Sequence, residues 1–275
     1  MLSDVVDLLA CPICADGLTL DGPVLRCPSR HSFDVAKQGY VSLLPGGAHT
    51  GTADTAAMVA ARAAFLDAGH YAPLAVALAD LASGTVLDAG AGTGHYLAAC
   101  LRADSSASSR GSVGLALDLS KHATRRAARI PRVGAVVADL WKPLPIRDAV
   151  ADTVLNVFAP RNPAEYRRVL RPGGRLLVAT PGPDHLAELV GPLGLLSVDP
   201  HKDRRLADSL AGAFTLADAT PLTIPLTLTR PEAVTLISMT PSAHHIPEPE
   251  IQTRLPSTPT ITTTAHIRLA TYLPT

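Results

Sequence analysis

The feature that most constrains this chain is a glycine-rich turn, Asp88-Ala-Gly-Ala-Gly-Thr-Gly94. The apolar residues 85–87 before the turn predict a buried strand, and residues 95–102 after it predict a helix. Glycines between a strand and a helix let the backbone reverse sharply and leave peptide N–H groups open to a ligand. Their spacing is G-x-G-x-G, whereas a dinucleotide-binding turn has G-x-G-x-x-G, and position 95 is His. The turn therefore predicts a nucleotide-like ligand that is held by bare backbone.

From residue 85 onward, strand-like and helix-like segments alternate along the chain. Such alternation predicts an α/β fold, a doubly wound parallel sheet with helices on both faces. Two later β-like segments, 221–230 and 262–272, flank a helix at 231–239 and fit an antiparallel hairpin that closes one edge of the sheet. The predicted parallel strands are Thr85–Asp88, Val113–Asp118, Ala135–Asp139, Thr153–Phe158 and Arg175–Thr180, with helices at 95–102, 121–129 and 163–170.

A polar side chain stands at the end of most of these predicted strands. In an open α/β sheet the ligand lies beyond the carboxyl ends of the strands. A buried carboxylate without a partner is costly, so three acids that each end an apolar run favour contact with a ligand. For any one of them, a helix N-cap is the alternative. The residues at these ends are Asp88, Asp118, Asp139, Asn156 and Thr180.

The glycine spacing and these acids together resemble the cofactor site of the Rossmann-like S-adenosylmethionine-dependent methyltransferases. Against that cofactor, Asp118 is placed to accept from the ribose hydroxyls and Asp139 from the adenine amino group. Asp88 would orient the glycine loop or reach the methionine ammonium through water. A nicotinamide dehydrogenase would use the same second-strand acid, so the glycine spacing and Asp139 are what argue against it. The backbone would approach the cofactor at Gly90, Gly92 and Gly94.

Two close pairs of metal-binding residue types stand near the start of the chain. Cys11 and Cys14 are separated by two residues, Cys27 and His31 by three, and twelve residues lie between the pairs. Short strands at 19–20 and 24–26 predict a hairpin between the pairs, which is the arrangement of a zinc ribbon. A closed set of four ligands predicts one structural Zn²⁺ and not a catalytic one; the alternative is three unligated cysteines.

The composition divides the chain into three parts. We assign a zinc-ribbon domain to residues 1–44, a linker and helical lead-in to residues 45–83, and a methyltransferase domain to residues 84–275. The lead-in has a linker rich in glycine and two helical stretches, and Tyr71 lies on the break between these stretches. Tyr71 could be a core aromatic or could lie over the cofactor mouth.

Charge and hydropathy bound the function classes. The formal net charge is zero, so overall charge does not indicate nucleic-acid binding. Residues 119–180 nevertheless hold twelve Lys and Arg against four acids, which fits a phosphate-binding face and equally a solvated helix surface. The sequence has no membrane-spanning apolar run of about 18 residues, and the acids near its start are unlike a signal peptide. These features favour a cytoplasmic location, where cysteines serve more often as metal ligands than as disulfides.

The end of the fourth predicted strand is where methyltransferases meet the acceptor. Asn156 could orient a base edge there or only cap the following helix, and Arg161 could hold a phosphate or a carbonyl oxygen. The Pro-Pro-aromatic signature of amino-methylating enzymes does not follow Asn156. After the fifth strand, Asp184 predicts an N-cap, which places His185 in the first turn of a helix that faces the same crevice.

Several stretches together resemble one family, the RlmA-type 23S ribosomal RNA guanine-N1 methyltransferases. Within that family the chain is most similar to the actinomycete macrolide-resistance branch, the tylosin and mycinamicin resistance methyltransferases. The resemblance covers most of the chain and weakens after about residue 200. It is carried by the cysteine-rich ribbon and by FDVAKQGYVSLL, MVAARAAFLDAGHYAPL, DAGAGTG, NVFAPRNP and LRPGGRLLVATPGPDHLAEL.

The resemblance implies a substrate and a set of site residues. It implies methyl transfer from S-adenosylmethionine to N1 of a guanine in hairpin 35 of 23S rRNA, and resistance to macrolides as the result. It places zinc ligands on Cys11, Cys14, Cys27 and His31, and cofactor contacts on Tyr71, Gly92, Thr93 and His185. A homodimer is a further expectation. Two rival functions are a small-molecule methyltransferase of an antibiotic pathway and a non-catalytic RNA-binding module.

Overall fold

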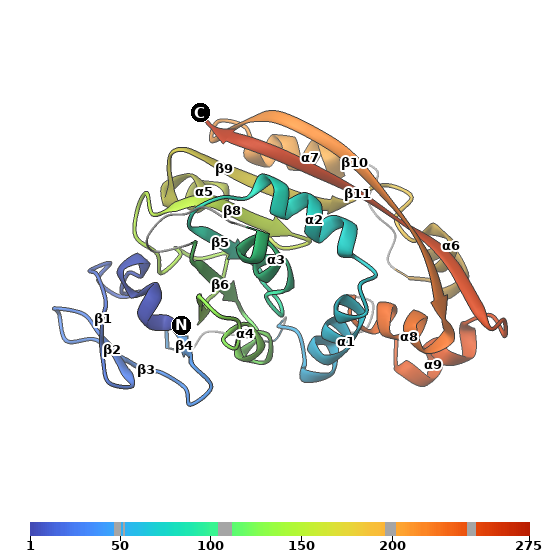
Figure 1. Ribbon diagram of the computed structural model, residues 1–275, viewed down its shortest axis with the longest axis horizontal. Helices are drawn as coiled ribbons and strands as arrows, with labels where there is room; N and C mark the ends of the chain where they lie inside the picture. The colour runs from blue at the N-terminus through green and yellow to red at the C-terminus, as the bar shows by residue number, and fades with distance from the viewer. Residues whose placement is uncertain (47–50, 52, 104–111, 196–201, 241–245) are drawn as a thin grey trace.

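A computed structural model describes residues 1–46, 51, 53–103, 112–195, 202–240 and 246–275 of the chain. Its centre is an eight-stranded sheet with the strand order β10-β11-β9-β8-β5-β6-β7-β4 (Figure 1). Within the described residues, no helix is both long and apolar enough to cross a membrane.

Six strands of the large sheet are parallel and two are antiparallel, as predicted for a doubly wound methyltransferase-type sheet. The apolar runs that predicted strands form its middle, because strands covered on both faces need apolar side chains on both sides. The parallel strands are β4 (Tyr40–Ser42), β5 (Val86–Ala89), β6 (Gly114–Asp118), β7 (Val133–Val137), β8 (Ala151–Val157) and β9 (Leu170–Pro181). The antiparallel strands are β10 (Phe214–Thr229) and β11 (Thr260–Pro274).

Helices cover both faces of this sheet (Figure 1). The first core cluster holds buried side chains of α2 (Ala72–Leu81), α3 (His95–Ala103) and α4 (Lys121–Ala127), together with Val86, Leu155 and Leu177 of the sheet. The second, on the other face, holds side chains of α5 (Pro163–Val169), α7 (Lys202–Leu210) and the 3-10 turns η1 (Leu2–Asp4) and η2 (Val6–Leu8) or their flanking residues. The expected three-layer architecture is confirmed.

The N-terminal ribbon is a separate three-stranded antiparallel sheet. It consists of β1 (Thr19–Asp21), β2 (Val24–Arg26) and β3 (Ser32–Asp34), and the first two contain the strands predicted from sequence. The turn between β1 and β2 has Gly22 at a φ of 58°, a conformation that glycine adopts without a Cβ penalty.

The predicted ribbon segment does not stand apart from the large sheet. Strand β4, inside residues 1–44, pairs in parallel with β7 and forms the edge of the eight-stranded sheet. Val5 is fully buried, and a Cβ built on Gly134 of β7 would lie 2.1 Å from its Cγ2. The sequence division at residue 44 therefore crosses a continuous hydrophobic core.

The other edge of the sheet extends into an arm. Strand β11 pairs with β9 only over residues 267–272, whereas its pairing with β10 continues to Thr260. The predicted antiparallel pairing of the two late strands is confirmed, and the helix predicted between them is α8 (Arg230–Ser238), with α9 (Glu248–Arg254) after it. The helix α1 (Ala56–Asp67) packs on α8, and α6 (Ala187–Leu193) packs on β11 (Figure 1).

Candidate cofactor site and metal centre

The glycine turn follows β5 and has a backbone that only glycine adopts easily. Gly90, Gly92 and Gly94 have φ values of 89°, 53° and 78°. A Cβ on Gly90 would lie 2.4 Å from Cβ of Ala159, and one on Gly94 would lie 2.5 Å from Cδ1 of Ile130. A side chain is therefore excluded at Gly90 and Gly94 by both the left-handed backbone and the close neighbours, and at Gly92 by the backbone alone. The turn presents bare peptide to the end of the sheet, as the sequence predicted.

Asp118, the last residue of β6, fixes this turn. One carboxylate oxygen accepts a hydrogen bond from the Gly92 N–H at 2.8 Å, and the other accepts from the Ser120 N–H at 2.8 Å. The N-cap alternative does not apply to Asp118, because the side chain of Ser120 caps α4. Burial raises the pKa of the Asp118 carboxyl, and its two backbone donors oppose that shift. Each oxygen keeps a second lone pair, so both can also accept from a ligand hydroxyl.

Asp88 lies on the neighbouring strand β5 in a different environment. It is 1% exposed, and neither of its carboxylate oxygens has a hydrogen-bond partner among the described residues. Burial, and next the charge of Asp118, raise its pKa to about 8. An orphaned buried carboxyl beneath a glycine turn fits a site that receives a polar, cationic ligand.

Asp139 lies two residues beyond the end of β7 and not within it. Its side chain is half-buried and accepts a hydrogen bond from the Trp141 N–H at 2.9 Å. One carboxylate oxygen of Asp139 is therefore used to stabilise a local turn, and the other is available to a ligand.

Asn156 is completely buried in β8, and its contacts face inward. Its amide nitrogen donates to the carbonyl oxygen of Pro160 at 2.7 Å and lies 3.2 Å from the hydroxyl oxygen of Tyr166. That hydroxyl also donates to the Pro160 carbonyl, at 2.9 Å. Asn156 does not cap α5, whose N-cap is Asn162. Asn156 thus stabilises the loop after β8 through the Pro160 carbonyl. Of the two residues predicted to orient the acceptor, only the half-buried Arg161 remains near the surface.

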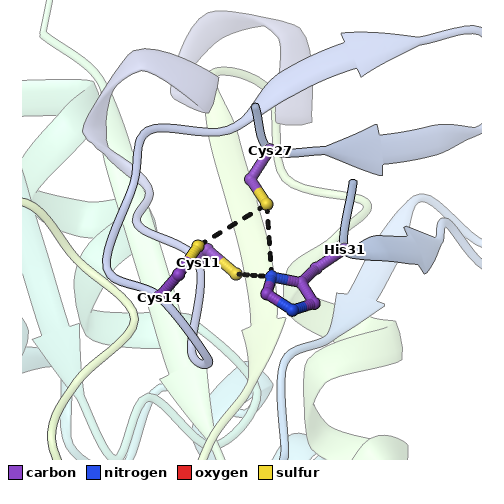
Figure 2. Close-up of side chains that lie close together, drawn as sticks. All are labelled: Cys11, Cys14, Cys27 and His31. Atoms are coloured by element: carbon purple, nitrogen blue, oxygen red, sulfur yellow. Dashed lines mark hydrogen bonds between the residues drawn. The ribbon is translucent and has the colours of Figure 1, made fainter. Parts of the chain in front are cut away.

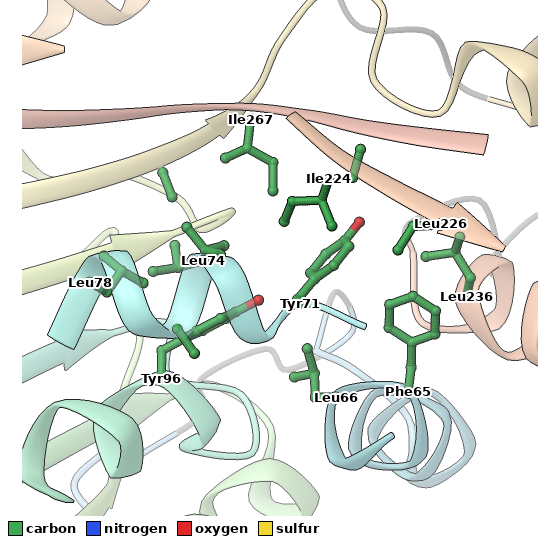
Figure 3. Packing of buried hydrophobic residues seen from close by; sticks show 14 of the residues in the cluster. Phe65, Leu66, Tyr71, Leu74, Leu78, Tyr96, Ile224, Leu226, Leu236 and Ile267 are labelled. Carbon is green, nitrogen blue, oxygen red and sulfur yellow. The ribbon is translucent and has the colours of Figure 1, made fainter. Parts of the chain in front are cut away.

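Tyr71 and His185, which the sequence left between packing and function, converge on one aromatic group. Tyr71 is buried at the start of α2, among Phe65, Leu66 and Ile224 (Figure 3). Its ring centroid lies 6.3 Å from that of Phe158, and Phe158 lies 6.1 Å from His185. Sequence reasoning did not single out Phe158, because an aromatic at the end of a strand predicts only packing.

The environment of His185 differs from the prediction. Helix α6 begins at Ala187 with Leu186 as its N-cap, so His185 lies in the turn before the helix and Asp184 is not the cap. The Nδ1 atom of His185 lies 2.8 Å from the carbonyl oxygen of His266 on β11, which orients the ring when Nδ1 carries the proton.

The four predicted metal ligands meet in the ribbon. The ligand atoms of Cys11, Cys14, Cys27 and His31 all lie within 4.8 Å of one another (Figure 2). Nδ1 of His31 lies 3.5 Å from Sγ of Cys11 and 3.4 Å from Sγ of Cys27, and Sγ of Cys14 lies 3.6 Å from Sγ of Cys27. Bonds of about 2.0–2.3 Å in a tetrahedron separate the ligands by roughly 3.5–3.8 Å. The donor set therefore fits Zn²⁺, with no position left for water.

The doubly wound sheet, the glycine turn and the acids beyond its strands define the fold of a class I methyltransferase. Residues 87–178 match the model of a methyltransferase domain, and residues 9–49 match the model of the RlmA N-terminal zinc ribbon. The chain is 48% identical to the 23S rRNA (guanine(748)-N1)-methyltransferase of Streptomyces fradiae, over 95% of this chain and 94% of the relative. It is also 48% identical, over the full length of both chains, to a Micromonospora griseorubida protein described as a candidate 23S rRNA (guanine-N1)-methyltransferase.

The chain therefore belongs to the RlmA-type 23S rRNA guanine-N1 methyltransferases, a family that joins a zinc ribbon to an S-adenosylmethionine-dependent methyltransferase domain. The glycine turn and the buried Asp88 carboxyl, which has no hydrogen-bond partner among the described residues, fit the cofactor. The cysteine–histidine cluster fits the zinc.

Proposed function

We propose that this protein transfers a methyl group from S-adenosylmethionine to N1 of the guanine in hairpin 35 of 23S rRNA that corresponds to position 748. The observation that carries the proposal is the 48% identity to the Streptomyces fradiae enzyme over almost the whole of both chains, ribbon included. Methylation at N1 blocks the pairing edge of the base, and we propose that it hinders macrolides that bind near this hairpin.

Each residue of the candidate cofactor site would have its own part in holding the cofactor. Asp118 would accept hydrogen bonds from the ribose hydroxyls on its free lone pairs, and Asp139 would accept from the adenine amino group on the oxygen that Trp141 does not use. Tyr71, Thr93 and His185 would contact the methionine end, and Asp88 would lie near its ammonium group. The bound cofactor supplies an electrophilic methyl group, so the protein has to align the acceptor nitrogen with it while the N1 proton leaves to solvent.

A basic surface on α4 and the ribbon is placed to hold the RNA backbone. Lys121, Arg125, Arg126 and Arg129 are exposed along this helix and just beyond its end, and none has an ion pair within the described part of the chain. The exposed Lys37 lies on the ribbon turn whose Gly39 lies against Ala128 at the end of the same helix. By contrast, Arg168 is committed to Glu165 and Asp148 and is unavailable to phosphate. Unpaired cations on one surface are what phosphate contact requires.

Primer extension on 23S rRNA tests the proposed reaction. Ribosomal RNA incubated with protein and cofactor should stop the polymerase at the modified guanine, because an N1-methyl group prevents pairing. Asp118→Ala should lose the stop, since the Gly92 N–H loses its acceptor and the ribose its partner. A roughly tenfold to hundredfold weaker cofactor affinity is expected from the removal of one charged hydrogen bond. A wild-type protein that binds the cofactor and gives no stop on free RNA or on assembled subunits would reject the proposal in favour of a small-molecule acceptor.

The α4 surface predicts a salt effect on RNA binding. Replacing Arg125, Arg126 and Arg129 by Ala should reduce the slope of log K against log salt by roughly 0.7–0.9 for each phosphate that the variant no longer neutralises. Cofactor affinity should not change. Arg204→Ala, which removes an exposed cation from α7, is the matched control. An unchanged slope in the triple variant would exclude this surface as an RNA-binding site.

The described residues give no support to the expected homodimer, and sedimentation of the free protein would establish its oligomeric state.

A further inference from the structure

Phe158 has a backbone conformation that packing does not explain. Its φ is 54°, in the left-handed region, which is strained for a bulky side chain and natural for glycine. The surrounding structure holds it there. Its N–H donates to the carbonyl of Ala179 on β9 at 3.0 Å, and the Asn156 and Tyr166 side chains hold the Pro160 carbonyl two residues later. Strain that the neighbours enforce in this way is characteristic of functional positions.

The side chain of Phe158 gains little from burial in return. It is 42% exposed, one of few large hydrophobic side chains so open among the described residues. Its ring is tilted by 48° against Tyr71 and by 46° against His185, so neither neighbour stacks flat on it. The strained backbone thus presents an aromatic ring with an accessible surface.

The ring lies close to the glycine turn that is proposed to hold the cofactor. The next residue, Ala159, is the one that excludes a Cβ from Gly90 of the glycine turn. Tyr71 and His185 flank the ring, and both belong to the cofactor end of the proposed site. A planar acceptor that lies on this ring would be held next to the bound methyl donor.

We infer that Phe158 is the stacking platform for the acceptor guanine after the base has left its helical stack. This inference rests on the proposed function and adds to it the residue that receives the base. An enzyme that modifies a base must take it out of the stack, and aromatic faces commonly hold a base that is turned out. Stacking fixes the plane of the guanine, and the edge that carries N1 can then turn towards the methyl group. Phe158 is in this sense an acceptor-binding residue, and Asn156 and Tyr166 are positioning residues beneath it.

Substitutions that separate ring, volume and backbone test this inference. Phe158→Leu keeps an apolar side chain of similar bulk and removes the aromatic face, so kcat/KM with the RNA should fall by about tenfold to a hundredfold. Phe158→Tyr keeps the face and should stay within about threefold of the wild type. Both variants should bind S-adenosylhomocysteine as the wild type does. Leu216→Ala, which removes an exposed apolar side chain from the distant strand β10, is the control for surface hydrophobicity.

Phe158→Gly gives a readout that a merely structural role would not produce. Glycine relieves the left-handed strain, so the melting temperature should equal or exceed that of the wild type while methylation is lost. The inference is overturned if Phe158→Leu methylates at the wild-type rate, or if its activity falls only in proportion to its cofactor affinity. A wild-type protein that methylates no hairpin would instead overturn the proposed function, so the two failures are distinguishable.

Discussion

The metal centre and the candidate cofactor site are both built from a few polar side chains, but they are assembled in opposite ways. The four metal ligands come from one hairpin, between Cys11 and His31, and their positions follow from local turns. The residues proposed to hold the cofactor, among them Tyr71, Asp88, Asp118 and His185, come from separate elements of the sheet and its flanks. A local site can be recognised from residue spacing, whereas a distributed site depends on the order of the strands.

The two regions also differ in what stabilises them. The three-stranded ribbon buries few apolar side chains within itself, among them Leu18 and Leu25, so a bound Zn²⁺ would supply much of its folding free energy. The candidate cofactor site rests instead on a large apolar core on both faces of the sheet. The ribbon nevertheless contacts that core through Val5 and β4, so the two regions are not independent in stability.

Removal of the zinc is expected to have the largest effect and to affect mainly the ribbon. Cys27→Ser should reduce zinc from about one ion per chain to near zero, with a loss of stabilisation on the order of 10 kcal/mol in the ribbon. Hydrogen exchange should then rise across β1 to β3 and remain slow in β5 and β6. If the ribbon amides stay protected from exchange in the zinc-free variant, the ribbon does not depend on the metal for its stability. Cys100→Ser, which changes a buried cysteine outside the cluster, is the control.

A smaller effect is expected at the candidate cofactor site, where Asp88 makes stability depend on pH. In the folded protein its carboxyl keeps the proton up to about pH 8, whereas in the unfolded chain it releases it near pH 3.9. Unfolding therefore releases a proton between these values, and a rise in pH from about 4 to 8 lowers the free energy of unfolding, by as much as about 5 kcal/mol.

Asp88→Asn should remove this pH dependence, because the amide does not ionise. Thermal melts from pH 5 to pH 9 should show the variant gaining stability relative to the wild type as the pH rises. Parallel melting curves for the two proteins over this range would show that Asp88 does not carry the effect. The ribbon should show no matching change, since Asp88 lies in β5.

The smallest of these effects tests the connection between the two regions. Gly134→Ala places a methyl group against Val5 and should lower the free energy of unfolding by about 1–3 kcal/mol through overpacking. Val5→Ala makes room for that methyl group, so the double variant should be more stable than the sum of the two single changes predicts. Strict additivity of the free energies would show that the ribbon does not press on the sheet at this point.

Much of the fold follows from the sequence, and the exceptions have physical reasons. The glycine turn and the alternating segments predicted the sheet because their patterns are local and periodic. Strand β4 was missed as part of the large sheet because three residues, Tyr40–Ser42, carry no period, and their partner β7 is remote in the chain. The start of α6 was misplaced because Asp184 has the right residue type for a cap, while Leu186 takes the left-handed conformation instead.

The candidate site divides in the same way. The metal ligands could be named from spacing alone, and Asp118 from its place after an apolar run. The inward-facing contacts of Asn156 could not be predicted, because the burial of a polar residue at a strand end depends on the loop folded over it. Phe158 carried no signal, because a positive φ at a phenylalanine leaves no trace in the residue type.

The pairing of β4 with β7 has a consequence for the order in which the chain folds as it is synthesised. The ribbon ligands leave the ribosome early and close together, so the metal can organise them while the rest of the chain is still missing. Tyr40, however, pairs with Ala135, and Val5 packs against the backbone of Gly134. The ribbon and β4 precede β7 in the chain, so this strand edge must stay open until β7 emerges. A ribbon already closed around zinc would hold that edge in shape during the delay.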